Sequence, residues 1–323
     1  MPAMFRLLAA ALLLLSSACS APADIHETRF IMGTLVEFTI IDDDRDKAES
    51  AIAAAAVEMQ RIEDAFTIYG DQPNAVKSFN AAVPNTPVEL TDEVSQLLTL
   101  ALKVKRQSGD AFDPALGGLN LLWGFSGDDA PSSPPPTRAI EDAIPPKHCI
   151  EHVGDRWMRT DRRCLLDFGA IAKGYAIDRG IAVLRQHGIR NALINGGGDI
   201  RLIGSHGKRP WHIGIRHPRK KGEVLESLQL KGDVSIVTSG DYERFFIYHG
   251  KRYHHLINPE TGWPATKAQS ATVIAGSATL ADAWSTALFI QGADGIKMQQ
   301  EMHQKALLVD DQGKIYGSLE KSR

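Results

Sequence analysis

The stretch Leu165-Leu166-Asp167-Phe168-Gly169-Ala170-Ile171-Ala172-Lys173-Gly174-Tyr175-Ala176-Ile177-Asp178 decides how the fold of this chain is predicted. Two apolar residues are typical of the end of a buried strand, and the acid that follows opens a turn of small residues. Ile177, Ile181 and Leu184 then recur at i, i+4 and i+7, which predicts a helix with Gly188 as its C-cap. The pattern is therefore that of a strand, a turn and a helix.

The turn before this helix has two interpretations. A helix start exposes free backbone N–H groups, which stabilise anions such as phosphate, and Lys173 would add a positive charge there. In the alternative, Asp167 is a helix N-cap and Lys173 is a solvated residue of the first turn, because strand-turn-helix joints are common. This stretch alone does not decide between them.

The composition is that of an ordinary globular protein. The chain has 323 residues, 43% hydrophobic and 23% charged, which is enough for one large domain or two modest ones. Its formal net charge is −3 and no basic stripe dominates, so a broad nucleic-acid-binding surface is not expected. The local basic cluster at residues 216–221 is interpreted as a solvated loop.

The N-terminus has the pattern of an export signal. Arg6 is a minimal positive region, residues 7–15 form a short apolar core, and small residues then lead to Cys19. This resembles a bacterial lipoprotein signal, in which Cys19 is lipidated and becomes the first mature residue. The apolar run is too short to span a membrane. We therefore expect a signal peptide over residues 1–18, a tether over residues 19–26, and an exported, membrane-anchored lipoprotein that faces the periplasm.

Export would place the two other cysteines, Cys149 and Cys164, in an oxidising compartment. The strand expected from Cys149, with its return through Trp157, could bring the two sulfur atoms close enough to form a disulfide. Two free, buried thiols are the alternative. Three cysteines in all are too few for a fold built on disulfides.

Strands and helices alternate irregularly along the rest of the chain. Helices are expected over residues 47–65, 92–108 and 279–290. Strands are expected over residues 27–40 (with a central turn), 192–194, 200–203, 211–216, 235–238, 244–248, 252–257, 271–275 and 306–316, and short strands over 149–166. Residues 70–80 and 115–136 are expected to be loops. Without a repeat or strict alternation, the sequence favours an α+β fold over a doubly wound sheet.

Asp282 and Thr286 are spaced at i and i+4 on the last expected helix, so their side chains share one face. Carboxylate and hydroxyl oxygens are hard ligands, which suit Mg²⁺ better than a soft metal. Taken alone, however, the pair is better explained by a surface acid on an amphipathic helix. The His and Cys residues do not have the spacing of a zinc site.

Two further segments allow a functional or a structural interpretation. Residues 253–262 close a strand with a Pro-containing turn, and a histidine at a strand end can accept a proton near neutral pH. A hydrogen-bonded structural histidine explains the same pattern equally well. Residues 195–199 (Asn-Gly-Gly-Gly-Asp) would let the backbone approach a ligand closely. They also suit a permissive turn, and they lack the surroundings of a dinucleotide fingerprint.

These weak signals occur in the order that is typical of one family. The segments are Met32-Gly33-Thr34, Ala111-Phe112-Asp113-Pro114, and residues 167–174, 195–199, 238–243, 254–262 and 282–286. Together they resemble the ApbE family, whose members are flavin transferases that move FMN from FAD onto a protein. The resemblance begins near Glu27 and implies one domain over residues 27–323. Its expected fold is α+β and related to the T-fold, with mixed or antiparallel sheets and packed helices.

The resemblance also implies a set of site residues. FAD would be held by Met32, Tyr69, Ala111, Phe112, Asp113, Asp167, Lys173 and Leu256. The metal would be Mg²⁺, bound by Asp282, Thr286, the backbone carbonyl of Ala170 and a carbonyl of Ser285. The sequence departs from the family pattern at Thr67, where a serine is usual, and at Asn258, where an aspartate is usual.

The chemistry follows from the substrate. Because FAD contains a pyrophosphate, transfer of FMN requires attack at its riboflavin-side phosphorus with AMP as the leaving group. Such reactions are catalysed mainly by positioning and charge neutralisation, here by Mg²⁺, Lys173 and the helix start. The nucleophile would be a Ser or Thr hydroxyl of an acceptor protein, expected to be a subunit of a membrane-bound redox complex. His255 is the candidate base and His254 the second choice.

Three other functions stay open. A hydrolase on the same fold would use water in place of the acceptor and release FMN and AMP. An exported flavin-binding carrier would need neither a metal nor a base, so the presence of Asp282, Thr286 and His255 argues against it. A solute-binding lipoprotein would have two similar α/β lobes, which this sequence does not show.

Overall fold

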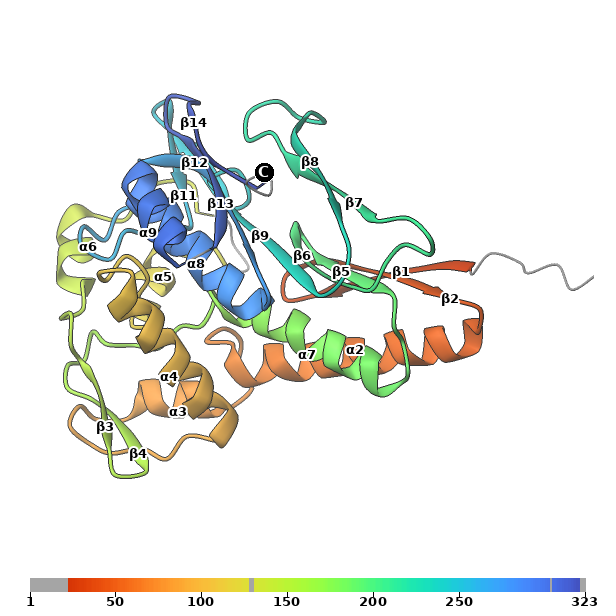
Figure 1. The fold of residues 1–323 in the computed structure, drawn as a ribbon. Helices are drawn as coiled ribbons and strands as arrows, with labels where there is room; N and C mark the ends of the chain where they lie inside the picture. The colour runs from red at the N-terminus through yellow and green to blue at the C-terminus, as the bar shows by residue number, and fades with distance from the viewer. Residues whose placement is uncertain (1–22, 128–130, 303, 320–323) are drawn as a thin grey trace, which may run out of the picture.

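The computed structural model describes residues 23–127, 131–302 and 304–319 of the chain. A sheet of eight strands lies at its centre, and each neighbouring pair is antiparallel (Figure 1). In spatial order the strands are β1 (Ala23–Ile31), β2 (Thr34–Asp42), β5 (Ala192–Gly196), β6 (Asp199–Ile203), β9 (Val234–Gly240), β12 (Ala268–Ala275), β13 (Lys305–Asp310) and β14 (Ile315–Ser318). This architecture confirms the predicted α+β class.

Three helices cover one face of the sheet: α2 (Arg45–Phe66), α7 (Ala172–Gln186) and α8 (Ala278–Gln291) (Figure 1). α2 packs on α7, and α7 packs on α8. The buried residues of α2 recur at three- and four-residue spacings from Ala48 to Phe66, which gives the helix one apolar face. α8 is buried on nearly all sides, because α7 and the sheet enclose it.

The opposite face of the sheet is covered by a hairpin of β7 (Trp211–Arg216) and β8 (Val224–Leu230). Trp211, Ile213 and Ile215 are buried and alternate with exposed residues, so the hairpin turns one side to the sheet. These three side chains share a hydrophobic cluster with residues of β6, β9 and β13. The sheet is therefore covered on both faces.

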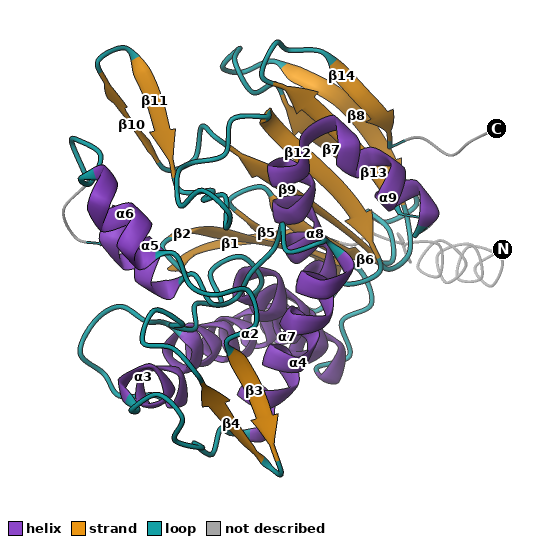
Figure 2. Ribbon diagram, turned by 90° about the vertical axis from the view of Figure 1, so that its left-hand side faces the viewer, coloured by secondary structure: helices purple, strands orange, loops and turns teal. Residues whose placement is uncertain are grey.

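The remaining elements pack around these layers (Figure 2). Stacked aromatic rings connect the β10–β11 hairpin to α5 and the residues after it, with Phe246 on Phe125 and Tyr253 on Trp123. These remaining elements are α3 (Ala75–Ala81), α4 (Asp92–Gln107), α5 (Gly117–Trp123), α6 (Thr137–Ala143), β3 (Ile150–Val153), β4 (Arg156–Arg159), β10 (Phe245–Tyr248), β11 (Lys251–His254), a 3-10 turn (Gly292–Asp294) and α9 (Gly295–Glu301).

The sequence did not predict several short elements. α3 and α5 lie in the segments 70–80 and 115–136 that were expected to be loops, and α6, α9 and β8 were not expected either. Each of the five has seven residues. A helical period cannot be recognised over seven residues, which explains why the four helices were missed. The strand β8 was missed because its sequence does not alternate strictly between apolar and polar residues.

The strand expected to end at Leu166 is not formed. Leu165 makes only an isolated parallel bridge to Leu116. α7 begins at Ala172, so the interpretation of Asp167 as its N-cap is wrong. The end of α7 is close to the prediction, because Gly188 lies one residue past the C-cap with φ of 78° and its N–H bonds to the carbonyl of Arg185.

The predicted tether over residues 19–26 is too long. Residues 23–26 belong to β1, and Ile25 is buried in the core. The predicted signal peptide over residues 1–18 and its Cys19 lie outside the described residues. Within the part of the chain that is described, no helix has the length and apolar character needed to cross a membrane.

Cys149 and Cys164 form a disulfide, which confirms the predicted pairing. Their Cα atoms are 6.2 Å apart, and the bond closes a loop that contains β3 and β4. Both cysteines are buried and cluster with Ala115. The disulfide therefore joins the two ends of this hairpin and packs against the segment that precedes α5.

Candidate active site

A cavity of about 710 Å³ brings the predicted site residues together. Its walls come from the β1–β2 turn, the loops before α5 and α7, the residues after β11, and α8. The predicted site residues that line it are Met32, Tyr69, Ala111, Phe112, Asp113, Asp167, Ala170, Lys173, His255, Leu256, Asp282 and Thr286. Ser285 is the exception, since its buried hydroxyl bonds to Ser239 and to the carbonyl of Asp282.

Asp167 is held by residues that are distant in sequence. One carboxylate oxygen accepts a hydrogen bond from the N–H of Gly169 (2.7 Å) and the other from the amide of Asn120 on α5 (2.6 Å). The N–H of Asp167 donates to the carbonyl of Pro114 (2.9 Å). Burial raises the pKa of this carboxyl group. These bonds fix the turn before α7 against the segment that carries Asp113.

Asp113 lines the cavity and also stabilises the loop that carries it. It forms a buried ion pair with Lys105 of α4, and its second oxygen accepts a hydrogen bond from the N–H of Ala115 (2.9 Å). Burial raises the pKa of Asp113, although Lys105 acts in the opposite direction. Tyr69 lines the same cavity, and burial with the nearby Asp167 raises its pKa to about 12. The Tyr69 hydroxyl therefore stays protonated at neutral pH.

Lys173, Asp199 and Asp282 form the charged centre of the cavity. The Lys173 Nζ lies 2.6 Å from a carboxylate oxygen of Asp199, and Asp282 accepts a hydrogen bond from the N–H of Gly174 (2.9 Å). Burial opposes the charge of Lys173, but Asp199 and Asp282 outweigh it and raise its pKa. Burial and Asp199 raise the pKa of Asp282 to about 7. Two carboxyl groups thus share one ammonium group.

The oxygen atoms near this centre fit a hard divalent cation. Asp282 offers a carboxylate and Thr286 a hydroxyl, and Ala170 lines the same cavity. The described residues contain no group of three or more His, Cys, Asp or Glu side chains that could bind a metal by themselves. A cation here would therefore need the hydroxyl and carbonyl oxygens, as the predicted set supposes. The part of Ser285 in that set stays a prediction.

The two adjacent histidines differ in what their rings contact. The ring of His254 is buried: its Nε2 bonds to the carbonyl of Ala265 (2.8 Å), and its Nδ1 accepts the N–H of Leu256 (3.3 Å). His254 is therefore structural, which removes it as the second choice for the base. His255 lines the cavity, and its buried Nδ1 has no hydrogen-bond partner among the described residues. Burial, with the positive charge of Arg244, lowers the pKa of His255 to about 3.

Met32 occupies a strained position at the cavity wall. It lies in the β1–β2 turn with φ of 58°, followed by Gly33 with φ of 66°. A non-glycine residue in this region is unfavourable, and such strain gathers at functional sites. The N–H of Met32 donates to a carboxylate oxygen of Glu63 on α2 (2.7 Å), which holds the turn in place.

The polar residues of the cavity that were missed as site residues include Glu63, Asn120, Asp199 and Arg244. Asp199 belongs to the glycine-rich motif, and Arg244 follows the motif over residues 238–243, so position next to a motif was a usable signal. Glu63 and Asn120 had no such signal, since their partners lie 31 and 47 residues away in sequence.

The two departures from the family pattern keep their local hydrogen bonds. The hydroxyl of Thr67 accepts the N–H of Tyr69 (3.1 Å), and the side-chain oxygen of Asn258 accepts the N–H of Glu260 (2.8 Å). Serine and aspartate carry the same acceptor atoms, so both exchanges preserve the turn.

The proteins to which this chain is similar belong to one family. The model of the ApbE family matches residues 32–308. An FAD:protein FMN transferase of Rhodobacter capsulatus is 32% identical over 313 residues, which cover 93% of this chain and 58% of that protein. One from Klebsiella pneumoniae is 30% identical over 286 residues, which cover 86% of this chain and 81% of that protein. The chain thus spans little more than half the length of the Rhodobacter relative.

A solved structure has the same fold. The crystal structure of the ApbE protein from Thermotoga maritima superposes with a TM-score of 0.84 at 34% sequence identity. The match covers 92% of this chain and 97% of that one. The predicted fold of the family is therefore present here.

Proposed function

This chain belongs to the ApbE family, the family of the FAD:protein FMN transferases, and we propose that it moves FMN from FAD onto a Ser or Thr hydroxyl of an acceptor protein and releases AMP. The observation that carries the proposal is the Nδ1 of His255, which has no hydrogen-bond partner within the described part of the chain. His255 lines the same cavity as Lys173 and Asp282. A proton acceptor and a charged centre are the two parts that this reaction needs.

The reaction balances without a further reagent. The hydroxyl oxygen of the acceptor forms a bond to the riboflavin-side phosphorus, and the bond from that phosphorus to the bridging oxygen breaks. AMP leaves with the electron pair of the broken bond, and the hydroxyl proton passes to a base. In-line transfer of this kind depends on orientation and on neutralising the phosphate charge.

His255 is the proposed base. Its pKa of about 3 means that the ring is neutral, and therefore able to accept a proton, at neutral pH. The same low pKa makes it a weak base in the empty cavity. The negative phosphates of bound FAD would favour the protonated ring and raise this pKa. The base would thus gain strength when its substrate is present.

The proposed metal is Mg²⁺, held by Asp282, Thr286 and the carbonyl of Ala170. When bound, it would neutralise phosphate oxygens of FAD. Lys173 would contribute a second positive charge, and Asp199 keeps its ammonium group in the cavity. The hard oxygen donors of this wall support the assignment.

A hydrolase that forms FMN and AMP is the second candidate, because a base beside a charged centre can also activate water. The test is to incubate the mature protein with FAD, Mg²⁺ and a candidate acceptor, and to measure AMP and protein-bound flavin fluorescence together. A transferase should release AMP in step with covalent flavin and turn over slowly without acceptor. Rapid release of free FMN without acceptor would instead assign the hydrolase.

The proposed location is the periplasmic face of a membrane, with Cys19 as the lipid anchor. The disulfide between Cys149 and Cys164 supports an oxidising compartment. The acceptor would then be a membrane-bound protein on the same side, such as a subunit of a redox complex. A Cys19→Ala variant should move from the membrane to the soluble fraction, and an unchanged distribution would contradict the anchor.

A further inference from the structure

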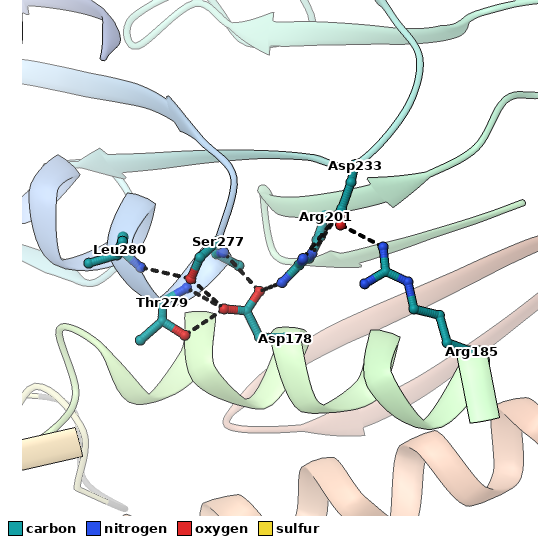
Figure 3. A network of polar contacts seen from close by, with 8 residues as sticks. Asp178, Arg185, Arg201, Asp233, Ser277, Thr279 and Leu280 are labelled. Carbon is teal, nitrogen blue, oxygen red and sulfur yellow. Dashed lines mark hydrogen bonds and ion pairs between the residues drawn. The ribbon is translucent and has the colours of Figure 1, made fainter. Parts of the chain in front are cut away.

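Asp178 lies on α7, one turn after Gly174, and contacts the start of α8 instead of the cavity (Figure 3). One carboxylate oxygen accepts the N–H of Ala278 (2.8 Å). The other accepts the hydroxyl of Ser277 (2.7 Å) and both the N–H (3.0 Å) and the hydroxyl (2.6 Å) of Thr279. α8 is thus capped by an acid that comes from a different helix, in addition to its own cap Ser277.

The opposite side of Asp178 is held by a chain of ion pairs (Figure 3). Arg201 of β6 pairs with Asp178, and both side chains are largely buried. Arg201 also contacts Asp233 (2.9 Å), which pairs with Arg185 at the end of α7 (2.6 Å). Asp233 is much more exposed than Asp178, with 44% of its side chain accessible. The charge that caps α8 is therefore balanced inside the protein.

α7 and α8 touch at a second point, one turn away. The N–H of Gly174 donates to Asp282 (2.9 Å), and a Cβ at Gly174 would lie 2.2 Å from the carbonyl oxygen of Ala278. Gly174 and Asp178 face α8 together because they are four residues apart. The two contacts fix both the spacing and the register of α8 against α7.

This register decides where the cation donors lie. Asp282 and Thr286 follow Thr279 on α8, whereas Ala170 precedes the first turn of α7. A slip or tilt of α8 would separate the carboxylate and hydroxyl from the carbonyl. Bond lengths to Mg²⁺ are short and its geometry is strict, so small displacements matter.

We propose that Asp178 is a positioning residue for the cation site: by capping α8 from α7, it holds Asp282 and Thr286 in register with Ala170. The inference rests on the metal named under the proposed function. It concerns binding of the cation alone, so it can be tested without flavin transfer.

The main test compares Asp178→Asn with Asp233→Asn in direct Mn²⁺ binding, measured by EPR without FAD. Five hydrogen-bond donors now approach the two carboxylate oxygens of Asp178, whereas an asparagine would offer them only one acceptor oxygen. Asp178→Asn should therefore weaken Mn²⁺ binding by about 10- to 100-fold. Asp233→Asn removes the more exposed of the two acids that pair with Arg201 and leaves the hydrogen bonds between Asp178 and α8 in place. It should change the affinity by no more than about twofold.

Each of the other outcomes also supports or overturns the proposal. A lower melting temperature of Asp178→Asn with unchanged Mn²⁺ affinity would show a purely structural role and overturn the proposal. If that variant does not fold, Thr279→Val, which removes one hydroxyl donor, should still weaken Mn²⁺ binding a few-fold, and no change would overturn it. Asp282→Ala should abolish binding; if it does not, the cation site and this inference fall together. Mn²⁺ binding without any flavin transfer would refute only the proposed function.

Discussion

His254 and His255 are neighbours in sequence, but their environments give them different tasks. Both ring nitrogens of His254 are bonded, so its role is to hold the turn after β11. His255 lines the cavity, its Nδ1 has no hydrogen-bond partner among the residues that the structure describes, and its pKa is lowered. A strand-end histidine pattern could not distinguish these two cases, because the difference depends on Ala265 and Arg244, which are not encoded in the local pattern.

At this scale the first prediction separates binding from transfer. His255→Ala should retain FAD binding and lose FMN transfer by roughly 10²- to 10⁴-fold, since a base is needed only for the proton. FAD affinity is measured by fluorescence quenching and transfer by in-gel flavin fluorescence. His254→Ala is the matched control and should lower stability by about 1–3 kcal/mol through its lost bonds. A collapse of FAD affinity in His255→Ala would identify a binding residue instead.

The second prediction concerns acid stability. The pKa of His255 is about 3 in the folded protein, whereas the ordinary value is 6.5. Above pH 6.5 the ring is neutral in both folded and unfolded chains, so its contribution is intact. As pH falls from 6.5 toward 3, only the unfolded chain takes up the proton, and stability is lost. Wild type should therefore lose about 1–2 kcal/mol more than His255→Asn between pH 6.5 and pH 5.

Urea unfolding at pH 8, 6.5 and 5 measures this difference. The quantity to compare is the change in unfolding free energy with pH, because the asparagine also changes the stability at pH 8. Parallel stability curves for the two proteins would mean that His255 is solvated enough to titrate normally.

At the scale of elements, α7 carries Lys173 and contacts α8, the helix that carries Asp282 and Thr286. Its first turns carry Lys173 and Gly174, and Asp178 caps α8. The sequence predicted this helix from its apolar period, and also the spacing of Asp282 and Thr286. It could not predict that Asp178 caps another helix, since its partners are about 100 residues away. Asp167 illustrates the same limit: its partner Asn120 lies on α5, which was too short to be recognised.

The third prediction tests the close approach of α7 and α8. Gly174→Ala places a Cβ within 2.2 Å of the carbonyl oxygen of Ala278, so the helices must separate. We expect a loss of about 1–3 kcal/mol in unfolding free energy and a large loss of transfer. Gly276→Ala is the matched control, because nothing lies within 4 Å of its added Cβ. Thermal melts of both variants decide the matter; equal melting temperatures would refute the packing argument.

At the scale of the whole molecule, the long strands and helices could be predicted and the closure of the cavity could not. The helices α2, α4 and α7 and most strands have recognisable periods, so their existence could be predicted from the sequence. α8 is buried on nearly all sides and was predicted without such a period. The cavity depends on contacts between segments that are distant in sequence, such as Met32 with Glu63 and Asp167 with Pro114. A hydrophobic period within one segment does not predict such contacts. The ordered motifs nevertheless identified most of the lining, because each motif marks one wall.

The fourth prediction concerns the disulfide. Unreduced, denatured mature protein should yield neither Cys149 nor Cys164 to quantitative thiol labelling. The double variant Cys149→Ala, Cys164→Ala should be less stable by about 3 kcal/mol, as expected for a loop of this length. Reduction of wild type should lower the melting temperature to that of the variant and leave the variant unchanged. Two reactive thiols before reduction would contradict the pairing.

If Cys19 is lipidated, the length of β1 limits how far the cavity can lie from the membrane. Four residue steps separate Cys19 from Ala23, and a chain of that length reaches roughly 14 Å at most. β1 then runs nine residues, about 30 Å, to the turn where Phe30 and Met32 line the cavity. If Cys19 carries lipid, the β1–β2 turn can therefore lie no more than about 45 Å from the bilayer. If the chain acts as proposed, an acceptor fixed in the same membrane would have to bring its hydroxyl group within that distance of the bilayer.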